Sequence, residues 1–304
     1  MTDRATQYSD QFVRRVLETI PEGWSDDAYL DVHLDGPQSR LTEFRTQALP
    51  ELEFHCGSLE GRRVLEYGCG KGSATVSIAT AADEVFAFDI DARSVDVCRA
   101  RLAEHGLENV SVHHAPDFES LRNVAGTFDV VVLHAVLEHV PISVDGLRGR
   151  VLREAFSALR PGGYLFIFET PNRLWPRDIH TTGLWLIPWT RAGSPWAYRR
   201  AVAAGKHHDR PDVSPGPLGL EERGAWGATY FGVRAELPRG EYRVVNLEPG
   251  HDRWVRYTRT IGTKRRVLET ALYWTATRYA RIPVVAFAPM LSPLVICRVG
   301  GTSE

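Results

Sequence analysis

The stretch "VLEYGCGKGS", residues 64–73, places three glycines at alternate positions directly after an apolar run. Gly68, Gly70 and Gly72 separate a predicted strand from the small, apolar residues of a predicted helix. Glycine allows a ligand to approach the backbone, and the free N–H groups at the start of the helix would face that ligand. The stretch therefore predicts a strand-to-helix turn that holds a nucleotide or a carboxylate, or a tight turn with no ligand.

Strands and helices alternate on both sides of this turn. The pattern predicts strands at 63–68, 84–89, 110–114, 129–134 and 164–169, and helices at 72–80, 92–105 and 144–159. Strands that are apolar throughout are buried on both faces, so a parallel sheet covered by helices is expected. The sequence RPGG at 160–163 is expected to end the last of these helices and to turn into the fifth strand.

The regions outside this alternation differ in character. Spaced apolar positions over 8–56 predict helices ahead of the first strand. From 171 to about 231 periodicity is weak, prolines are frequent, and five of the eight tryptophans occur, namely Trp175, Trp185, Trp189, Trp196 and Trp226. Such a segment is typical of a functional lid or of a subunit interface, and both interpretations stay open. Strands at 242–247 and 293–299, flanking a helix at 264–280, are expected to close the sheet.

Composition sets the broad class of the protein. The chain has 304 residues and a net charge of -2, so it has no overall attraction to nucleic acid, although residues 251–281 are locally basic. Four cysteines without a CxxC pair argue against a zinc site or a disulfide framework and favour a reducing compartment. A polar N-terminus and a proline-broken apolar stretch at 282–297 argue against a signal peptide and a membrane span. A cytoplasmic protein is expected.

A carboxylate follows the glycine turn at an informative distance. The second predicted strand ends in Asp89, 21 residues after Gly68. Such a carboxylate accepts the ribose hydroxyls of an adenosine held over the turn. The G-x-G-x-x-G motif of proteins that bind nicotinamide dinucleotides would require glycine at position 73, where this chain has Ser73.

Several motifs together resemble those of a known family. The pattern E-x-G-x-G-x-G over 66–72 resembles motif I of the class I S-adenosylmethionine-dependent methyltransferases. The resemblance continues in order with Asp89, "APDFESL" at 115–121, "FDVVVLHAVLEHV" at 128–140 and "ALRPGGYLFIFETPNR" at 158–173. It covers roughly residues 60 to 173 and is nearest to the small-molecule group (type 11/12) that includes the ubiquinone O-methyltransferases. It implies an α/β fold: a Rossmann-like, doubly wound, seven-stranded sheet, mostly parallel with an antiparallel last strand, plus N-terminal helices and a lid insertion.

The resemblance also implies roles for individual residues. Glu66, Gly68 and Gly70, with Gly72 in the same turn, would hold the methionine part of S-adenosylmethionine, and Asp89 would hold its ribose. Asp117 would meet the adenine amino group, with Phe118 beside the ring, and His134 would contact the cofactor mainly through its backbone. The implied division is an N-terminal helical cap (1–57), a cofactor-binding core (58–170), a substrate-binding lid insertion (171–240) and a C-terminal completion of the sheet (241–304).

Methyl transfer to a hydroxyl requires alignment, exclusion of water and removal of a proton. His139, just past the fourth strand, and His180, seven residues beyond Arg173, are the candidate bases. A structural, hydrogen-bonded role is the alternative for each. In related methyltransferases an E-x-x-E-H pattern with a distant histidine is associated with a divalent metal, but this chain has Ala135 in place of the first glutamate. No metal is therefore expected, and Glu138, His139 and His180 are the weak alternative set.

The expected function is O-methylation of a small, partly apolar molecule in biosynthetic or secondary metabolism, with S-adenosylhomocysteine as the product. The acceptor pocket would be walled by Trp175, Trp185 and Trp189, with Arg173 or Arg177 meeting an anionic group. Open alternatives are N-methylation, methylation of RNA or another macromolecule through the basic segment 251–281, and a cofactor-binding subunit without turnover. A homodimer through the tryptophan-rich insertion is a further expectation.

Overall fold

The computed structural model describes residues 8–116, 125–251 and 275–300, apart from positions 22, 38, 211 and 212, together with residues 267 and 271. The chain separates into two compact units. Unit 1 comprises Met1–Val132 and Ser157–Tyr164, and unit 2 comprises Leu133–Phe156 and Leu165–Glu304. Strands β4 (Phe128–His134) and β5 (Leu159–Phe168) contribute residues to both units.

Within the described residues, seven strands form one sheet in the order β3-β2-β1-β4-β5-β9-β7. The strands besides β4 and β5 are β1 (Arg63–Tyr67), β2 (Glu84–Asp89), β3 (Val110–His114), β7 (Tyr242–Val244) and β9 (Leu294–Arg298). β1 and β3 both pair with β2 in parallel, whereas β7 and β9 pair antiparallel. The predicted fold class, a mostly parallel sheet with an antiparallel strand toward one end, is confirmed.

The order of the strands places the glycine turn at a special point of the sheet. β1 lies between β2 and β4, so the chain runs to one side of β1 for β2 and β3 and to the other side for β4 and β5. Parallel α/β sheets bind ligands outside the carboxyl ends of their strands at such a reversal. Apolar, β-branched residues build these strands, and β4 is buried from Phe128 to Leu133.

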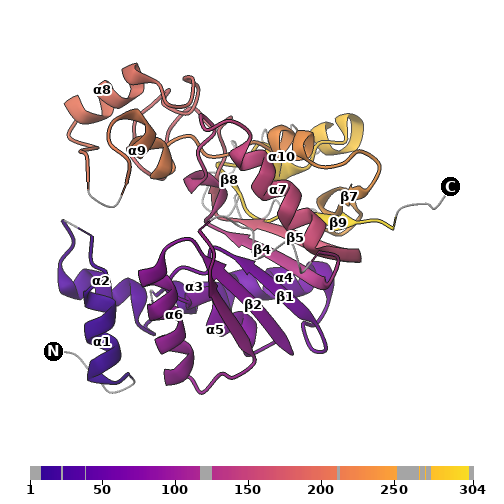
Figure 1. Cartoon of the computed structure of the whole chain (residues 1–304). Coiled ribbons are helices and arrows are strands. Elements are labelled where there is room, and N and C mark those ends of the chain that lie inside the picture. Colours follow the sequence, from indigo (N-terminus) through magenta and orange to yellow (C-terminus); the bar gives the residue numbers. More distant parts are fainter. Residues whose placement is uncertain are drawn as a thin grey trace. The chain divides into compact units, whose positions relative to one another are not determined.

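The helices of unit 1 pack against one another around its part of the sheet (Figure 1). They are α1 (Asp10–Leu17), α2 (Asp26–His33), α3 (Arg40–Glu43), the π-turn η2 (Phe44–Ala48), α4 (Leu49–Cys56), α5 (Ser73–Ala79) and α6 (Ala92–Glu104). Ser9, Ser25 and Ser39 cap the first three helices by accepting a backbone N–H. Phe12 and Val16 of α1 pack with Val97 of α6 in one apolar cluster, so the N-terminal helices are part of a core.

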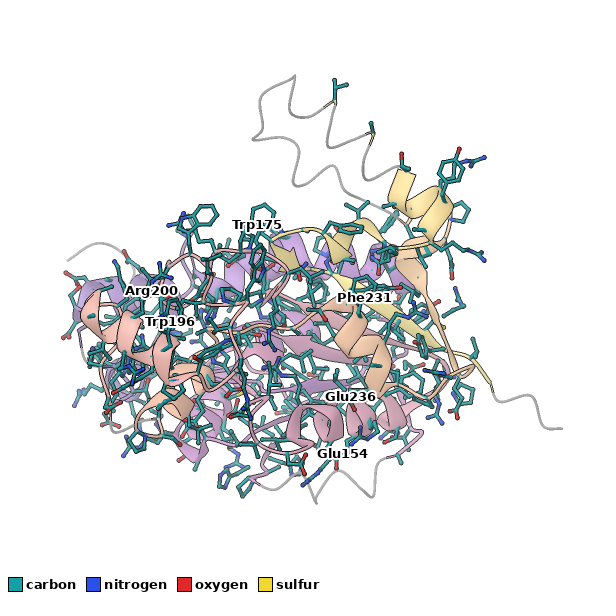
Figure 2. All side chains as sticks on the ribbon, turned by 90° about the horizontal axis from the view of Figure 1, so that it is seen from above. Glu154, Trp175, Trp196, Arg200, Phe231 and Glu236 are labelled. Carbon is teal, nitrogen blue, oxygen red and sulfur yellow. The ribbon has the colours of Figure 1, made fainter. Side chains whose placement is uncertain are left out.

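Unit 2 contains the remaining elements, except that the last two residues of α7 belong to unit 1. They are the 3-10 turn η4 (Leu137–His139), α7 (Leu147–Ala158), β6 (Thr170–Pro171), α8 (Pro195–Ala203), α9 (Pro217–Glu222), α10 (Tyr230–Glu236), η5 (Val245–Leu247), η6 (Ala276–Ala280), η7 (Val284–Ala286) and β8 (Met290–Leu291). β6 pairs antiparallel with β8. The insertion after β5 has its own apolar core, which includes Ile187, Ala197, Leu220 and Trp226. Figure 2 shows Trp196 and Arg200 together on the ribbon of α8.

Two expectations about boundaries were wrong in detail. The RPGG sequence lies inside β5 instead of forming a turn before it. A Cβ atom on Gly163 would lie 3.0 Å from the carbonyl oxygens of Phe128 and Asp129, so glycine lets β5 pass unusually close to β4. The strand predicted at 242–247 ends at Val244, where the 3-10 turn η5 begins.

Some expectations lie beyond what the structure describes. The basic residues Lys264, Arg265 and Arg266 and most of the helix predicted at 264–280 are outside the described residues. The four-part domain division stays a prediction. Among the helices that are described, none combines the length and apolar character needed to cross a membrane.

Candidate active site

The glycine turn after β1 has a backbone that favours glycine at each of its three positions. Gly68, Gly70 and Gly72 have φ angles of +67°, +51° and +82°. A Cβ atom on Gly72 would lie 2.8 Å from Sγ of Cys98 on α6, so this position also requires a residue without a side chain. The turn therefore brings its backbone close to α6 and leaves room above Gly70, where a Cβ atom would meet nothing within 4 Å.

Asp89 holds this turn from the end of β2. Its Oδ2 accepts a hydrogen bond from the backbone N–H of Gly70 at 2.8 Å, and its Oδ1 accepts one from the N–H of Asp91 at 2.9 Å. Burial raises the pKa of Asp89, and these two backbone bonds oppose the rise. The carboxylate is fixed beside the turn with lone pairs left for further donors.

Glu66 is a buried carboxyl without a complete set of partners. Its side chain lies on β1 and is 1% exposed, and its Oε2 has no hydrogen-bond partner among the described residues. Burial raises the pKa of Glu66 to about 7, although a hydrogen bond with the Thr75 side chain lowers it. Buried polar atoms are normally paired, so the free oxygen fits a ligand that brings a donor, above all a cationic amino group.

The other predicted cofactor residues are placed only in part. Asp117 and Phe118 lie outside the described residues. His134 ends β4 and its ring centroid lies 6.2 Å from that of Phe168. The roles assigned to these three residues stay predictions.

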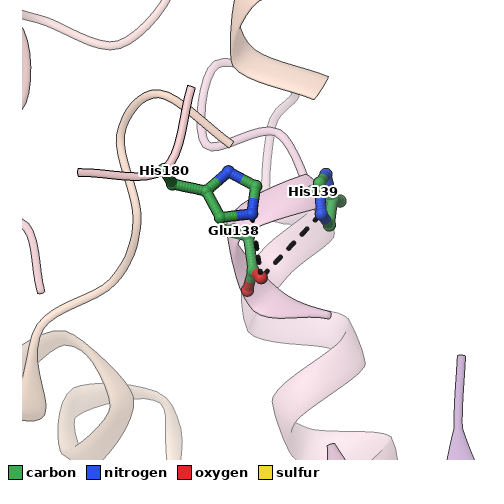
Figure 3. Close-up of side chains that lie close together, drawn as sticks. All are labelled: Glu138, His139 and His180. Carbon is green, nitrogen blue, oxygen red and sulfur yellow. Dashed lines mark ion pairs between the residues drawn. The ribbon is translucent and has the colours of Figure 1, made fainter. Parts of the chain in front are cut away.

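Unit 2 brings the two predicted catalytic histidines together around Glu138 (Figure 3). Glu138 lies in the turn that follows β4 and its side chain is fully buried. Thr170 donates its hydroxyl to Oε2 of Glu138 at 3.1 Å, whereas Oε1 has no hydrogen-bond partner among the described residues. Nε2 of His139 and Nε2 of His180 each lie 3.8 Å from this same Oε1.

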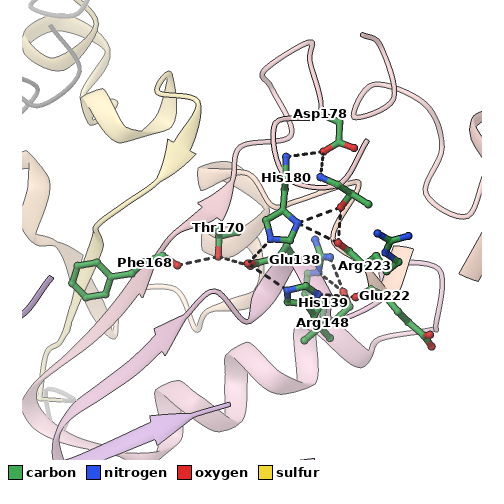
Figure 4. Close-up of polar contacts among 11 residues, drawn as sticks. Glu138, His139, Arg148, Phe168, Thr170, Asp178, His180, Glu222 and Arg223 are labelled. Carbon is green, nitrogen blue, oxygen red and sulfur yellow. Dashed lines mark hydrogen bonds and ion pairs between the residues drawn. The ribbon is translucent and has the colours of Figure 1, made fainter. Parts of the chain in front are cut away.

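The second nitrogen of each ring shows which tautomer is present. Nδ1 of His139 lies 2.7 Å from the carbonyl oxygen of Glu222, and Nδ1 of His180 lies 3.1 Å from that of Arg223 (Figure 4). A carbonyl oxygen only accepts, so both Nδ1 atoms carry hydrogen. In the neutral form each ring therefore directs the lone pair of Nε2 toward the carboxylate of Glu138.

Three electron-rich atoms thus converge on one point. Burial raises the pKa of Glu138, and the nearby His139 opposes that rise. Lone pairs facing a carboxylate repel one another unless a proton or a cation lies among them. The arrangement is therefore suited to receiving a proton on an imidazole, with the carboxylate stabilising the resulting charge, or to holding a metal ion.

Two features fix the position of His180. Asp178 is 2% exposed, and its carboxylate accepts the backbone N–H groups of His180, Thr181 and Thr182 at 2.7–3.0 Å. Gly224 has φ +92°, and a Cβ atom there would lie 2.7 Å from Nδ1 of His180 and 3.1 Å from Cγ of Glu138. The loop after α9 therefore lies directly over the ring, which only glycine allows.

Buried charges also tie this loop to the turn after β4. The Glu221 carboxylate accepts the backbone N–H of Ser143 at 3.0 Å and its hydroxyl at 2.6 Å. Arg148 donates to the carbonyl oxygen of Val140, and burial lowers its pKa to about 10. Hydrogen bonds to charged groups thus hold α9 against the segment that carries His139.

The residues predicted to bind the acceptor support the insertion itself. Arg173 donates to the carbonyl oxygens of Pro188 and Thr190, and Arg177 donates to that of Gly183. Trp175 is half-buried, whereas Trp185 and Trp189 are 58% and 60% exposed. Their role toward an acceptor stays a prediction.

The donor atoms of the histidine cluster suit a transition-metal ion. The three ligand atoms all lie within 4.8 Å of one another. Two donors bound about 2.1 Å from a tetrahedral ion lie roughly 3.4 Å apart, so the 3.8 Å separations would close with small movements. One carboxylate oxygen and two imidazole nitrogens fit zinc or a similar ion better than Mg²⁺.

Sequence reasoning missed Thr170, Asp178 and Gly224. The order Asp178-x-His180-Thr181 is typical of a loop in which an aspartate accepts the following backbone N–H groups, so this signal was available. Gly224 gave no local signal, because its neighbours His180 and Glu138 are distant in the sequence.

One family model matches a range of this chain that includes both the glycine turn and the histidine cluster. Residues 58–182 match the family model described as a methyltransferase domain. Two ubiquinone biosynthesis O-methyltransferases are similar: that of Aromatoleum aromaticum is 37% identical over 44% of this chain and 53% of its own length, and that of Bordetella avium is 34% identical over 45% and 53%. The chain thus spans about half the length of these curated relatives.

Among solved structures, the YcgJ protein of Bacillus subtilis aligns with 83% of this chain and 93% of its own, at 17% identity and a TM-score of 0.43. Glu66, Asp89, Glu138 and His180 all lie within the range that the family model matches. The resemblance inferred from the motifs is confirmed: residues 58–182 of this chain match the methyltransferase-domain family model.

Proposed function

We propose that this protein transfers a methyl group from S-adenosylmethionine to a hydroxyl group of a small molecule. The methyltransferase-domain match over 58–182 supports the reaction class. The observation that carries the choice of a hydroxyl acceptor is the convergence of His139 and His180 on the buried carboxylate of Glu138, because O-methylation of a hydroxyl needs a base. The similar curated proteins are O-methyltransferases of ubiquinone biosynthesis, which agrees with a small-molecule acceptor.

The methyl donor is S-adenosylmethionine, and the residues that would contact it belong to unit 1. Glu66 would pair its free Oε2 with the amino group of the methionine part. Asp89 would accept the ribose hydroxyls while it keeps its bonds to Gly70 and Asp91. The cofactor supplies an activated methyl group, so the protein needs only to align the acceptor, exclude water and remove the proton.

The proton is removed by a histidine of unit 2. A hydroxyl group held near Nε2 of His180 or His139 would donate its proton to that nitrogen as its oxygen bonds to the methyl carbon, while the bond from that carbon to the sulfonium sulfur breaks and S-adenosylhomocysteine leaves. The imidazolium so formed lies 3.8 Å from Oε1 of Glu138, whose negative charge stabilises it. The hydrogen bond from Nδ1 to a backbone carbonyl keeps each ring in the reactive tautomer throughout.

His180 is the preferred base of the two. Its side chain is 29% exposed compared with 45% for His139, and the Asp178 loop and Gly224 fix its ring. Water screens the electrostatic interactions of a less exposed base less strongly. The acceptor itself is assigned to the insertion 171–240, with Trp175, Trp185, Trp189, Arg173 and Arg177 as its candidate contacts.

A metal ion is the alternative use of the same three side chains. Glu138, His139 and His180 would hold it, and such an ion would acidify and orient a bound hydroxyl. The family resemblance includes metal-dependent members, but the glutamate that precedes this set in them is Ala135 here.

Paired pH–rate profiles test the proposed base. Wild type, His180→Ala and His139→Ala are compared on the same small hydroxylated acceptor, with and without a chelator. Loss of the base is expected to lower turnover by about 10²–10⁴-fold and to remove the acidic limb of the profile, with cofactor affinity unchanged. Full activity in both variants would overturn the base assignment, and activity that a chelator abolishes and divalent ion restores would favour the metal.

A further inference from the structure

Arg101 is a fully buried cation to which the proposed chemistry assigns no role. It lies on α6, and its Nη1 has no hydrogen-bond partner among the described residues. Burial lowers the pKa of Arg101, and the nearby Tyr8 opposes this change. Removing a guanidinium from water costs free energy, and an unpaired donor adds to that cost. The remaining contacts of Arg101 therefore indicate what the residue contributes.

The guanidinium of Arg101 joins the glycine turn to the end of α2. Its Nε donates to the carbonyl oxygen of Lys71 at 2.7 Å, and its Nη2 donates to the carbonyl oxygen of His33 at 2.5 Å. Lys71 lies between Gly70 and Gly72, and His33 is the last residue of α2. The last carbonyl groups of a helix have no partner within the helix and carry partial negative charge, so the end of α2 favours a cation.

Two aromatic rings hold the guanidinium in place. It lies 5.2 Å from the ring centroid of Phe12, on α1, and 6.0 Å from that of Tyr8. The faces of such rings attract a cation. The hydroxyl oxygen of Tyr8 lies 3.0 Å from Nε2 of His105, just past the end of α6, and α1 contacts both α2 and α6 (Figure 1). The N-terminal helices thus keep Arg101 away from water and in one position.

Arg101 acts on the middle of the glycine turn. Gly70 and Gly72 have positive φ angles on either side of Lys71, and glycine leaves a peptide free to rotate. The carbonyl of Lys71 and the N–H of Gly72 belong to one planar peptide group, so the bond from Arg101 fixes the direction of both. On the preceding side Asp89 accepts the N–H of Gly70. The turn is therefore held from two sides, by a carboxylate and by a guanidinium.

We propose that Arg101 is a positioning residue for cofactor binding, because its hydrogen bond keeps the Lys71 peptide in the orientation in which the glycine turn binds S-adenosylmethionine. The inference rests on the assignment of the cofactor to this turn, which is part of the proposed function. Arg101 acts through the backbone and needs no contact with the cofactor. A turn that is already ordered loses less conformational entropy when a ligand binds, so the affinity is higher.

Filling space is the alternative role for Arg101. An apolar side chain of similar volume would fill the same place without burying a charge, and such replacements are often neutral or stabilising. The backbone N–H of Ser9 donates to Glu104 at 3.0 Å, so α1 is also held on α6 by a contact that does not involve Arg101. Arginine differs from an apolar residue in having donors that reach two backbone segments at once, at Lys71 and His33. These contacts favour positioning over filling.

Titration calorimetry with S-adenosylhomocysteine tests the proposal on the full chain, at a temperature well below the cooperative melting of each variant. Arg101→Met fills much of the same space but removes the charge and both hydrogen bonds. Its affinity is expected to fall about 10-fold, the equivalent of one ordinary hydrogen bond. Arg101→Lys keeps the charge but cannot reach both carbonyl oxygens, so a loss of about threefold is expected.

Arg99→Met is the matched control. Arg99 lies on the same helix, its side chain is 52% exposed, and it also donates to a backbone carbonyl oxygen, that of Val112 at 2.8 Å. Its affinity for S-adenosylhomocysteine should equal that of the wild type. An equal loss of affinity in Arg99→Met and Arg101→Met would overturn the proposal, because the effect would then not depend on the bond to the turn.

Hydrogen exchange without ligand gives a second measurement, which a space-filling role would not change. Amides of residues 68–73 should exchange faster in Arg101→Met and should regain the protection of the wild type when S-adenosylhomocysteine is saturating. Wild-type affinity in folded Arg101→Met, or faster exchange confined to α1 and α2, would contradict the positioning role alone. A wild type that releases no heat with S-adenosylhomocysteine would instead contradict the cofactor site on which the inference rests.

Discussion

Nε2 of His180 lies 3.8 Å from Oε1 of Glu138, although the two residues come from the insertion after β5 and from the turn after β4. The carboxylate is fully buried, and its other oxygen accepts the hydroxyl of Thr170. This relationship gives a histidine of the insertion an acidic partner that a lone exposed imidazole lacks. Under the proposed function, Glu138 positions the histidines and stabilises their positive charge, so replacing it should lower the rate and raise the stability.

Glu138→Gln is expected to be a slower but more stable enzyme. The amide keeps the shape and still accepts from Thr170, but it removes the charge that stabilises a protonated histidine, so turnover should fall by about 10²–10⁴-fold. Burial raises the pKa of Glu138, which means that its ionised form costs stability above that pKa. Thermal melting at neutral and alkaline pH should therefore rise in the variant. The surface change Glu236→Gln is the control and should alter neither quantity appreciably.

Asp89→Ala is expected to weaken binding of both S-adenosylmethionine and S-adenosylhomocysteine. A hydrogen bond to a charged group contributes about 1.5–3 kcal/mol, so the dissociation constant should rise roughly 10- to 150-fold. Titration calorimetry measures the change directly, with Asp96→Ala on the exposed face of α6 as the control. Tight NADH binding with no heat from S-adenosylhomocysteine would contradict the cofactor assignment.

Glu66 should make cofactor binding depend on pH. Its pKa is about 7 in the folded chain, against an ordinary value of 4.5, because it is buried. A positively charged amino group would favour the ionised carboxyl, so affinity for S-adenosylhomocysteine should increase with pH between these two values and level off above about 7. Calorimetry across this range, with Glu66→Gln as comparison, measures the slope. A pH-independent affinity in the wild type would argue against the contact.

The same carboxyl should affect folding without ligand. A raised pKa in the folded state contributes stability that is present below the unfolded value and lost as pH rises through the folded one. The difference between 4.5 and about 7 corresponds to on the order of 3 kcal/mol. The ligand-free wild type should therefore lose stability between these two pH values, measured by urea unfolding, and Glu66→Gln should lose less.

Gly224→Ala should displace the ring of His180. The new methyl group would lie 2.7 Å from Nδ1 of His180. The alanine would also have to adopt a φ angle of +92°, which L residues rarely adopt. Gly205→Ala is the matched control, because it has φ +64° and its Cβ atom would meet nothing within 4 Å. Both variants should lose about 1–2 kcal/mol of stability to the backbone, but only Gly224→Ala should lose turnover as well. Equal turnover in the two variants would show that the ring is not held by this contact.

The sequence by itself determined the sheet and the glycine turn. Apolar runs such as β4 are local patterns, and Gly68 to Gly72 followed by Asp89 is a spacing that can be read along the chain. The motif order predicted the family, and the family match over 58–182 agrees with that prediction, whereas the roles of Glu66 and Asp89 stay predictions. Local periodicity predicted the boundaries of the strands less accurately. β5 includes RPGG because Gly163 allows it to lie close to β4, and this contact cannot be seen in the local sequence.

Tertiary structure alone decided the geometry of the histidine cluster and the residues that surround it. His139 and His180 were candidates from their positions, but the distance of each to Glu138, the carbonyls of Glu222 and Arg223, and Gly224 over the ring come from segments far apart in the chain. The same holds for the tryptophans of the insertion, since a tryptophan packs into a core or faces water according to which neighbours the fold offers: Trp226 is fully buried, whereas Trp189 is 60% exposed. Sequence specifies the residue types, and long-range packing decides which of them meet, because burial energy depends on contacts that no local pattern contains.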